Sequence, residues 1–262
     1  VDIIMIRENT EGLYHSLLRR MEQRALGKKD DPIVIDEFPG LQGEVAWDPR
    51  PISRSGTERV IKFAFDYAKV RQKKSGKPQS VTCVDKSNVT RGCQLFRKIF
   101  REFSESNQDI AVKEAYIDAF TMWLVRNPED LDVVVLPNMF GDIATDLASV
   151  LQGGMGMSAS ANMGPKHMLF EPVHGSAPKH AGKNIVNPIA MIQSVQMMFE
   201  ALGFRKKDET LDICAEILQN AIRGHFEEGS PVTYDLGGTA STSDVGEAIA
   251  DRCERMLKER FQ

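Results

Sequence analysis

The feature that most constrains the fold is an alternation, from Asp2 to Leu151, of short apolar runs with longer segments of helical spacing. The runs have the length and the Val and Ile content of buried strands, and they alternate with segments whose apolar residues recur every three or four positions. The expected strands are Asp2–Ile6, Ser80–Val84, Ala111–Ile117 and Asp132–Leu136, and the expected helices are Ser55–Lys74, Arg91–Glu105, Ala119–Arg126 and Asp142–Leu151. This order favours an α/β fold in which helices cover a sheet.

The pattern changes near Gly153, where we expect a domain boundary. Residues 153–164 are rich in Gly, Met, Ser and Ala, and a segment rich in loop signals continues to Pro188. Three amphipathic helices are predicted after it, at Ile189–Leu202, Lys207–His225 and Ser243–Arg260. The sequence therefore predicts two domains, residues 1–152 and residues 153–262.

A β-rich arm is predicted within the first domain, at about residues 15–50. Between Lys28 and Trp47 apolar residues alternate with polar ones among prolines and glycines, which favours extended structure over helix. An arm of this kind often serves association between subunits, and a surface hairpin explains the pattern equally well.

Composition and charge exclude several classes of protein. The 262 residues are 42% hydrophobic and 27% charged, which is typical of a globular chain. The net charge of −4 predicts no nucleic-acid partner, and apolar runs broken by charges predict no membrane span. The first residues lack a signal-peptide pattern, so we expect a cytoplasmic location, with an organelle matrix as the alternative. The four cysteines lack zinc-ligand spacing and are interpreted as buried thiols.

The stretch NMFGDIATDLAS places Asp142 and Asp146 four residues apart at the start of a predicted helix. Two like charges on one helix face repel each other, so either water solvates both or a positive group lies between them. Both carboxylates are within reach of one hard divalent cation, which takes oxygen ligands. Asn138 and Gly141 stand at the carboxyl end of a predicted strand, where α/β sheets bind ligands.

Five motifs carry a resemblance to a known family. They are RENTEGLY (7–14), VDKSNV (84–89), DAF (118–120), GDIATDLAS (141–149) and HGSAPKHAGKNIVNP (174–188). In order and approximate spacing they resemble the metal-dependent β-decarboxylating dehydrogenases, which comprise isocitrate, homoisocitrate, 3-isopropylmalate and tartrate/D-malate dehydrogenases. The resemblance covers essentially the whole chain. It implies the isocitrate/isopropylmalate dehydrogenase-like fold, with two α/β domains that share a central sheet system.

The resemblance implies catalytic roles for residues of the first domain. Arg7 matches the arginine that binds a substrate carboxylate, a task suited to the fork of a guanidinium. Tyr14 matches the tyrosine that protonates the enolate after carbon dioxide leaves. Lys86 matches the lysine that helps remove the hydroxyl proton, and Asn88 matches a contact on the nicotinamide side. Without the motifs, Arg7 and Lys86 would be interpreted as surface residues and Tyr14 as a packing residue.

The resemblance also implies a site for Mg²⁺ or Mn²⁺, with Asp118, Asp142 and Asp146 as ligands. Such a metal chelates the hydroxyl and adjacent carboxylate of the substrate and later stabilises the enolate. In the family, the lysine and the first of these aspartates come from the partner subunit, so we expect a homodimer with composite active sites. Helices between Ala119 and Leu151 are candidates for the subunit contact, and core packing explains their apolar residues equally well. The alternative for Asp118 is an N-cap of the helix expected at Ala119.

The implied cofactor site is HGSAPKHAGKNIVNP, because the family does not use the Rossmann GxGxxG loop and the chain has none. His174 and Asn187 match adenine contacts, and Gly175 would let the backbone approach the ligand closely. The full set of implied cofactor residues is Asn88, His174, Gly175, Lys179, His180, Asn187, Tyr234 and Asp235.

The choice between NADP and NAD rests on a few of these positions. NAD-preferring relatives carry Asp-Ile where this chain has Lys179-His180, and a cation there would attract a 2′-phosphate. Tyr234 also matches a tyrosine that binds the 2′-phosphate, whereas Gly238 falls where NADP-preferring relatives have an arginine. We therefore expect NADP to be favoured over NAD.

The substrate is left open by the sequence. RENTEG is more similar to isocitrate, homoisocitrate and tartrate enzymes, whereas HGSAP and GGTASTSDVGEAI are as similar to the tartrate/malate branch. Isocitrate is favoured, with 3-isopropylmalate and tartrate or D-malate as alternatives. We expect the deciding residues to lie in an amino-terminal segment of the family that precedes the first matched motif. The alternative of another class is a non-catalytic regulatory subunit or inactive fragment, although Tyr14, Lys86 and the three aspartates are all retained.

Overall fold

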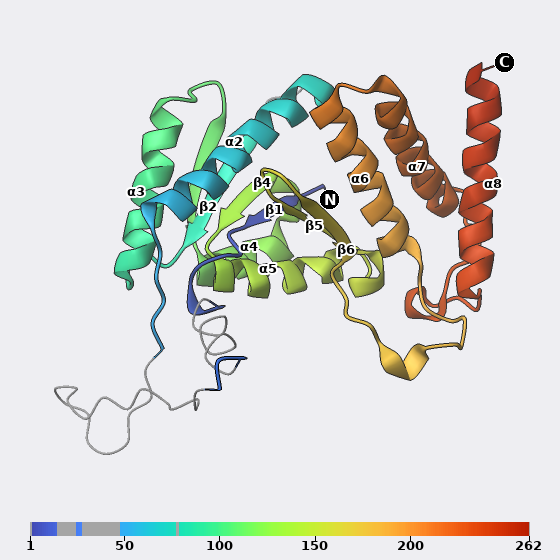
Figure 1. Cartoon of the computed structure of the whole chain (residues 1–262), viewed down its shortest axis with the longest axis horizontal. Helices are drawn as coiled ribbons and strands as arrows, with labels where there is room; N and C mark the ends of the chain where they lie inside the picture. The colour runs from blue at the N-terminus through green and yellow to red at the C-terminus, as the bar shows by residue number, and fades with distance from the viewer. Residues whose placement is uncertain (1, 15–24, 28–47, 77–78, 262) are drawn as a thin grey trace. The chain divides into compact units, whose positions relative to one another are not determined.

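The computed structural model describes residues 2–14, 25–27, 48–76 and 79–261. Most of the arm predicted at about residues 15–50, including the alternating stretch Lys28–Trp47, therefore lies outside the described residues. The chain divides into two compact units, Val1–Ala148 and Ser149–Gln262 (Figure 1). Each unit has a hydrophobic core of its own. Among the described helices, none has both the length and the apolar character needed to cross a membrane.

A four-stranded parallel sheet in the order β1–β4–β2–β3 forms the centre of the first unit. The strands are β1 (Ile4–Arg7), β2 (Ser80–Asp85), β3 (Ala111–Tyr116) and β4 (Val133–Leu136). All four residues of β4 are buried, as expected for an apolar strand covered on both faces. Arg7 pairs with Leu136 and Asp85 pairs with Tyr116, so the carboxyl ends of all four strands meet at one edge.

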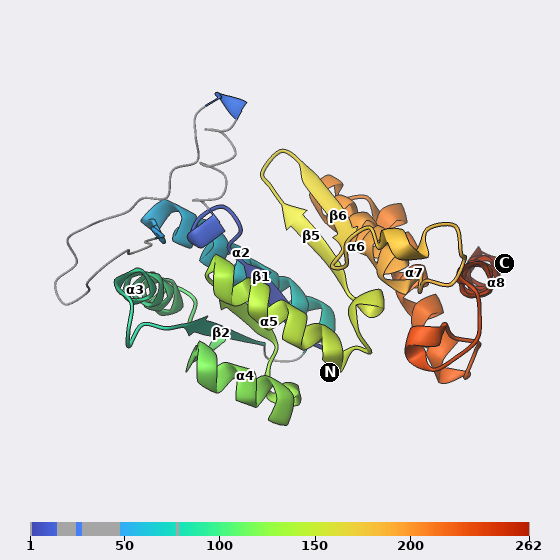
Figure 2. The same ribbon diagram turned by 90° about the horizontal axis from the view of Figure 1, so that it is seen from below.

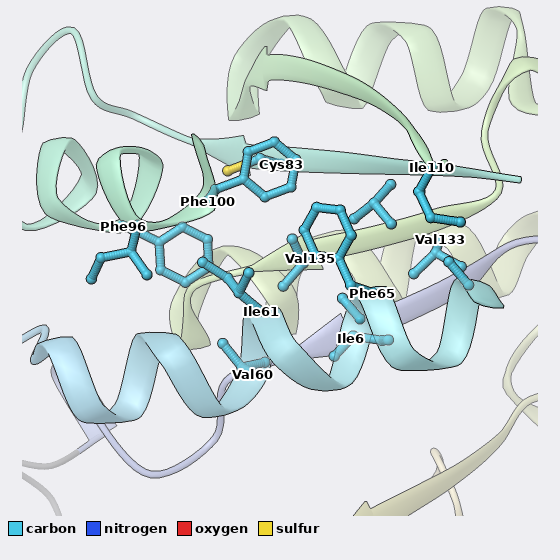
Figure 3. Close-up of a cluster of buried hydrophobic side chains, with 14 residues drawn as sticks. Ile6, Val60, Ile61, Phe65, Cys83, Phe96, Phe100, Ile110, Val133 and Val135 are labelled. Atoms are coloured by element: carbon cyan, nitrogen blue, oxygen red, sulfur yellow. The ribbon is translucent and has the colours of Figure 1, made fainter. Parts of the chain in front are cut away.

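Helices cover both faces of this sheet (Figures 1 and 2). On one face lie α2 (Arg54–Ser75) and α3 (Arg91–Glu105), and on the other lie α4 (Ile117–Arg126) and α5 (Asn138–Leu151). The core under α2 and α3 is filled by aromatic and branched side chains from both helices and from alternate strand positions (Figure 3). The Phe65 and Phe100 rings lie 5.6 Å apart, and burying each contributes about 1.5–3 kcal/mol.

The ends of α2 follow from the sequence. Ser53 is the N-cap and its hydroxyl accepts a hydrogen bond from the Gly56 N–H at 3.0 Å. Gly76 ends the helix in the left-handed conformation at φ 68°, and its N–H donates to the Gln72 carbonyl.

The predicted α/β class is confirmed, and all four strands and four helices predicted for residues 2–151 are present with ends shifted by a few residues. The N-cap of α4 is Tyr116, so the interpretation of Asp118 as a cap is wrong: Asp118 lies within the first turn of the helix. Its side chain is used in an ion pair instead, as described below.

The second unit contains α6 (Ile189–Lys206), α7 (Glu209–Glu227) and α8 (Thr242–Phe261). Lys207 lies in the left-handed conformation that ends α6, so the predicted start of the second helix there is wrong. The segment expected to be loop-rich also contains an antiparallel pair, β5 (Ala159–Met163) and β6 (Met168–Pro172). These strands lack β-branched residues, so their sequence gives little indication of a strand. The hydrogen bonds between the two strands hold them in the extended conformation.

Candidate active site

The ends of β1 and β4 bring together Arg7, Tyr14 and Asp142. Arg7 is the last residue of β1, and Asp142 lies in the amino-terminal part of α5. Arg7 Nη1 donates to Asp142 Oδ1 at 2.5 Å, and the Tyr14 hydroxyl donates to Asp142 Oδ2 at 2.5 Å. The Arg7 guanidinium also lies 5.2 Å from the centre of the Tyr14 ring. Arg7 is therefore a positive group beside one of the two aspartates that the sequence places on a single helix face.

Asn138 holds the guanidinium from its other side. The Nε and Nη2 atoms of Arg7 donate to Asn138 Oδ1 at 3.0 and 2.8 Å, and Asn138 Nδ2 donates to the Glu11 carbonyl at 2.9 Å. Asn138 is buried at the start of α5, directly beyond β4. Its position at the end of the strand is visible in the sequence, but its contact with Arg7 is not, because the two residues lie far apart along the chain.

Gly141 makes room for the stem of Arg7. A Cβ atom at this position would lie 2.6 Å from Arg7 Cγ and 2.8 Å from Arg7 Cβ, closer than carbon atoms approach in folded proteins. The glycine in the GDIATD motif therefore lets the arginine cross the amino-terminal part of α5 and reach Asp142.

Tyr14 is held in its protonated form. The pKa of its hydroxyl is raised above the ordinary value of 10.0, chiefly because the hydroxyl donates to the Asp142 carboxylate. Partial burial and repulsion from the same carboxylate act in the same direction, and the Arg7 charge partly offsets them. At neutral pH this side chain carries a proton and directs it towards the site.

Two glutamates fix the loop that carries Tyr14. Glu8 is buried, and its carboxylate accepts hydrogen bonds from the backbone N–H groups of Thr10 and Glu11, each at 2.9 Å. The Glu11 carboxylate accepts from the Ser53 N–H at 2.8 Å and so joins the loop to the beginning of α2. Arg7 thus belongs to the site itself, whereas the two glutamates of the RENTEG motif hold the backbone of the loop that carries the site.

Lys86 and Asp118 form a second group, at the ends of β2 and β3. Lys86 Nζ donates to Asp118 Oδ1 at 2.5 Å, and this hydrogen bond lowers the pKa of the aspartate. Lys86 is half-buried, whereas Asp118 is exposed. Asn88 is exposed in the turn that follows Lys86, which the Val89 N–H closes by donating to the Lys86 carbonyl at 3.0 Å.

The three predicted metal ligands do not converge within one chain. Among the described residues, no three side chains of His, Cys, Asp or Glu form a group that could hold a metal ion. Asp142 and Asp146 lie one turn apart on α5, which follows β4. Asp118 pairs instead with Lys86 at the ends of β2 and β3, the other two strands of the sheet. Two carboxylates at this spacing can supply oxygen ligands to a hard divalent metal, which would compete with Arg7 for Asp142 and take its remaining ligands from elsewhere.

The second unit brings four of the predicted cofactor residues into two contacts. The rings of His180 and Tyr234 stack with their centres 6.2 Å apart. Asn187 is buried, and its Nδ2 donates to Asp235 Oδ2 at 3.1 Å, while its Oδ1 accepts from the Ile189 N–H at the start of α6.

The other predicted cofactor residues of this unit lie between β6 and α6. His174, Gly175 and Lys179 are all exposed there. The Nδ1 atom of His174 lies 2.8 Å from the Gly175 carbonyl oxygen, and Lys179 belongs to the short helical turn Pro178–His180. In this loop Lys179 directly precedes His180, whose ring stacks on Tyr234.

Gly238 cannot carry a side chain with this backbone. A Cβ atom there would lie 2.0 Å from the carbonyl oxygen of Val232, and the Gly238 N–H is already used in a hydrogen bond to the Thr233 carbonyl. An arginine at this position, as in NADP-preferring relatives, would therefore require the backbone to move.

Comparison with known proteins identifies the family. The profile of the isocitrate/isopropylmalate dehydrogenase family matches residues 1–249. The chain belongs to this family. Homoisocitrate dehydrogenase of Methanocaldococcus jannaschii is 38% identical over 259 residues, which are 98% of this chain and 65% of that protein. The 3-isopropylmalate/3-methylmalate dehydrogenase of the same organism is 39% identical over 254 residues, 96% of this chain and 67% of that protein.

A solved structure agrees with this assignment. The crystal structure of isocitrate dehydrogenase from Methylococcus capsulatus matches with a TM-score of 0.78 at 36% identity, covering 96% of this chain and 67% of that one. The resemblance inferred from the five motifs is thus confirmed. The chain spans about two thirds of the length of these dehydrogenases.

Proposed function

We propose that the chain carries the catalytic residues of an enzyme that oxidatively decarboxylates a 2-hydroxy acid, with hydride transfer to NAD(P) and the help of a divalent metal. The observation that carries the proposal is the cluster of Arg7, Tyr14 and Asp142 at the carboxyl edge of the sheet, in a member of this dehydrogenase family. Isocitrate is the favoured substrate, with homoisocitrate, 3-isopropylmalate, and tartrate or D-malate as alternatives.

Each residue of the cluster has a role that its contacts support. The fork of Arg7, held by Asn138, binds a substrate carboxylate, which competes with Asp142 for the same donors. Tyr14 keeps its proton at neutral pH and donates it to the enolate carbon after decarboxylation. A divalent metal held by Asp142 and Asp146, Mg²⁺ or Mn²⁺, would acidify the hydroxyl group and stabilise negative charge on the enolate.

Lys86 and Asp118 are proposed to serve the active site of a neighbouring subunit in a homodimer. They pair with each other and not with the Arg7 cluster, which supports a role outside their own site. Helix α4, which carries Asp118, also exposes large apolar side chains: Met122, Trp123 and Val125 are 53%, 42% and 60% exposed. Several large apolar side chains exposed on one helix fit a surface that another chain covers.

The cofactor is proposed to be NADP in preference to NAD. Lys179 directly precedes His180, whose ring stacks on Tyr234, and an ammonium group suits a 2′-phosphate better than the ribose hydroxyls of NAD. Position 238 is a glycine whose backbone leaves no space for a side chain, so it supplies no cation to the 2′-phosphate. We therefore assign the phosphate to Lys179 and Tyr234 alone.

The test begins with the formation of reduced nucleotide from the purified protein, NADP or NAD, Mn²⁺ and each of the candidate acids. With the active acid, Tyr14→Phe and Lys86→Met are then assayed separately and after the two variants are mixed and allowed to exchange subunits. Composite sites predict that each variant is nearly inactive and that the mixture regains roughly a quarter of the wild-type rate, because half of the dimers are hybrids with one intact site of two. No activity with any acid contradicts the proposed function, and activity without recovery in the mixture contradicts the composite sites.

A further inference from the structure

The residue before Lys86 in the chain, Asp85, forms an ion pair with Arg97. Asp85, the last residue of β2, is fully buried, and its carboxylate receives two hydrogen bonds from Arg97 of α3. Arg97 Nε lies 2.8 Å from Asp85 Oδ2, and Arg97 Nη2 lies 2.9 Å from Asp85 Oδ1. A buried charge pair is costly to form and gives little net stability, so its position suggests a purpose other than stability alone.

The same guanidinium reaches the next strand. Arg97 Nη2 also donates to the Ala115 carbonyl of β3 at 2.9 Å, and the guanidinium lies 4.8 Å from the centre of the Tyr116 ring. Tyr116 is the N-cap of α4, the helix that carries Asp118. One side chain from α3 therefore ties the end of β2 to the end of β3.

Asp85 in turn fixes the backbone on both sides of Lys86. Besides its bonds to Arg97, Asp85 Oδ1 accepts the Ser87 N–H at 2.7 Å, so the residues before and after Lys86 are joined. The Lys86 ammonium lies 6.0 Å from the centre of the same Tyr116 ring that Arg97 contacts. The chain leaves β2 in one conformation, and this conformation directs Lys86 to Asp118.

We propose that Arg97 is a positioning residue for the catalytic pair: through Asp85, Ala115 and Tyr116 it holds Lys86 and Asp118 in the geometry that the reaction requires. The proposal rests on the proposed function, because it takes Lys86 to be catalytic. A guanidinium is needed because three hydrogen-bond acceptors, a ring and, 3.6 Å from Nη1, the Glu114 carboxylate lie around one planar group, and a lysine ammonium cannot satisfy this arrangement.

The test compares Arg97→Lys with Arg101→Lys. Arg101 lies one turn further along α3 and makes its own two-bond pair, at 2.6 and 2.7 Å, with Glu114 of the same strand β3. Both substitutions keep the positive charge and remove a two-bond contact of α3, Arg97→Lys the one to β2 and Arg101→Lys the one to β3. Only Arg97 touches Asp85, so an effect of Arg97→Lys that Arg101→Lys does not share measures the connection to Lys86.

The first measurement needs no catalysis. The full chain is acetylated with a small amine-reactive reagent, and the rate at Lys86 is followed by mass spectrometry against the rate at Lys62, which pairs with Asp66 on α2. In Arg97→Lys we expect Lys86 to react about two- to fivefold faster, because its ion pair with Asp118 is loosened. In Arg101→Lys the ratio should stay at the wild-type value. An unchanged ratio in Arg97→Lys overturns the proposal, whether or not the chain turns over substrate.

The second measurement separates positioning from stability. With the active hydroxy acid, Arg97→Lys should lower kcat by about 10- to 100-fold with little change in KM, the usual effect of displacing a catalytic group. In a Lys86→Met background the same substitution should have a clearly smaller effect on kcat, because one of the two residues through which it acts is gone. A loss of kcat that persists undiminished in that background contradicts the proposal. Should the wild type itself be inactive, the proposed function fails and the labelling ratio still decides on Arg97.

A second variant covers the case in which Arg97→Lys does not fold. The double substitution Asp85→Asn with Arg97→Gln removes both buried charges together and leaves groups that can hydrogen-bond each other, which is far less costly than leaving one charge unpaired. It still removes the two-bond clamp, so we expect the same rise in Lys86 labelling. A folded double variant with the wild-type ratio overturns the proposal.

Discussion

Gly141→Ala tests how the Arg7 site is built. The new methyl group would meet Arg7 Cγ at 2.6 Å, whereas non-bonded carbons rest at about 3.5–4.0 Å, so the arginine stem must move by roughly 1 Å. That movement would separate the guanidinium from Asp142 and Asn138. A displacement of this size in a substrate-binding group costs on the order of 100-fold in kcat/KM.

The stability change has two parts of opposite sign. Replacing a helical glycine by alanine stabilises a helix by about 0.5–1 kcal/mol, while forcing extra atoms into a packed site costs about 1–3 kcal/mol. Gly246→Ala is the matched control, because Gly246 lies equally near the start of α8 and no atom lies within 4 Å of the added Cβ. The difference between the two variants therefore isolates the clash with Arg7 and should be about 1–3 kcal/mol.

The two variants are compared by urea unfolding, followed by circular dichroism, and by kcat/KM with the active acid. We expect Gly246→Ala to be stabilised with unchanged kcat/KM, and Gly141→Ala to be no more stable than wild type with a large loss of kcat/KM. The reasoning is refuted if Gly141→Ala gains as much stability as Gly246→Ala and keeps its activity.

Three further predictions concern charge. Asp142→Asn should lower the pKa of Tyr14 towards its ordinary value, because the largest cause of its elevation is removed; tyrosinate absorbance at 295 nm measures this, and identical titration curves would contradict it. Since the folded-state pKa of Tyr14 is raised, its stabilising effect is complete below about pH 10 and is lost as the pH rises through the raised value. Burial lowers the pKa of His225, so the contribution of this residue to stability should be complete above about pH 6.5 and be lost as the pH drops through the lowered value. His225→Gln should therefore reduce the fall in thermal midpoint between pH 7 and 5. Lys179→Asp should reduce kcat/KM for NADP relative to NAD by about tenfold or more, whereas Lys183→Asp in the same loop should leave the ratio unchanged.

The sequence was most informative where a local pattern determines the structure. The VVVL run of β4 and the helical spacing after it predict both elements, because a fully apolar strand and an amphipathic helix each have a local signature. The order β1–β4–β2–β3 is not local: it depends on which strands pair across the sheet, so the pattern alone gives no order. The sequence did not predict β5 and β6 for the same reason, because these two strands depend on pairing with each other and not on a local pattern.

The candidate site shows the same division. The motifs name Arg7 and Asp142 separately, and the repulsion argument predicts a positive neighbour or water for the aspartate. Only the structure shows that this neighbour is Arg7, because the two residues come from opposite ends of the first unit's sequence. Arg97 is typical of the residues that sequence reasoning misses, since it acts by holding another side chain and has no motif of its own. The position of Asn138 at the end of a strand is visible in the sequence, but its contact with Arg7 is not.

The most direct test of the central claim is to measure reduced nucleotide and carbon dioxide together, from the hydroxy acid on which the wild type is active, with Mn²⁺ and with the metal removed by a chelator. The account predicts equal amounts of the two products from the wild type with Mn²⁺, none with chelator, and almost none from Asp142→Asn under either condition. Reduction of the nucleotide without release of carbon dioxide, or equal rates with and without the metal, would contradict the proposed function, metal-dependent oxidative decarboxylation.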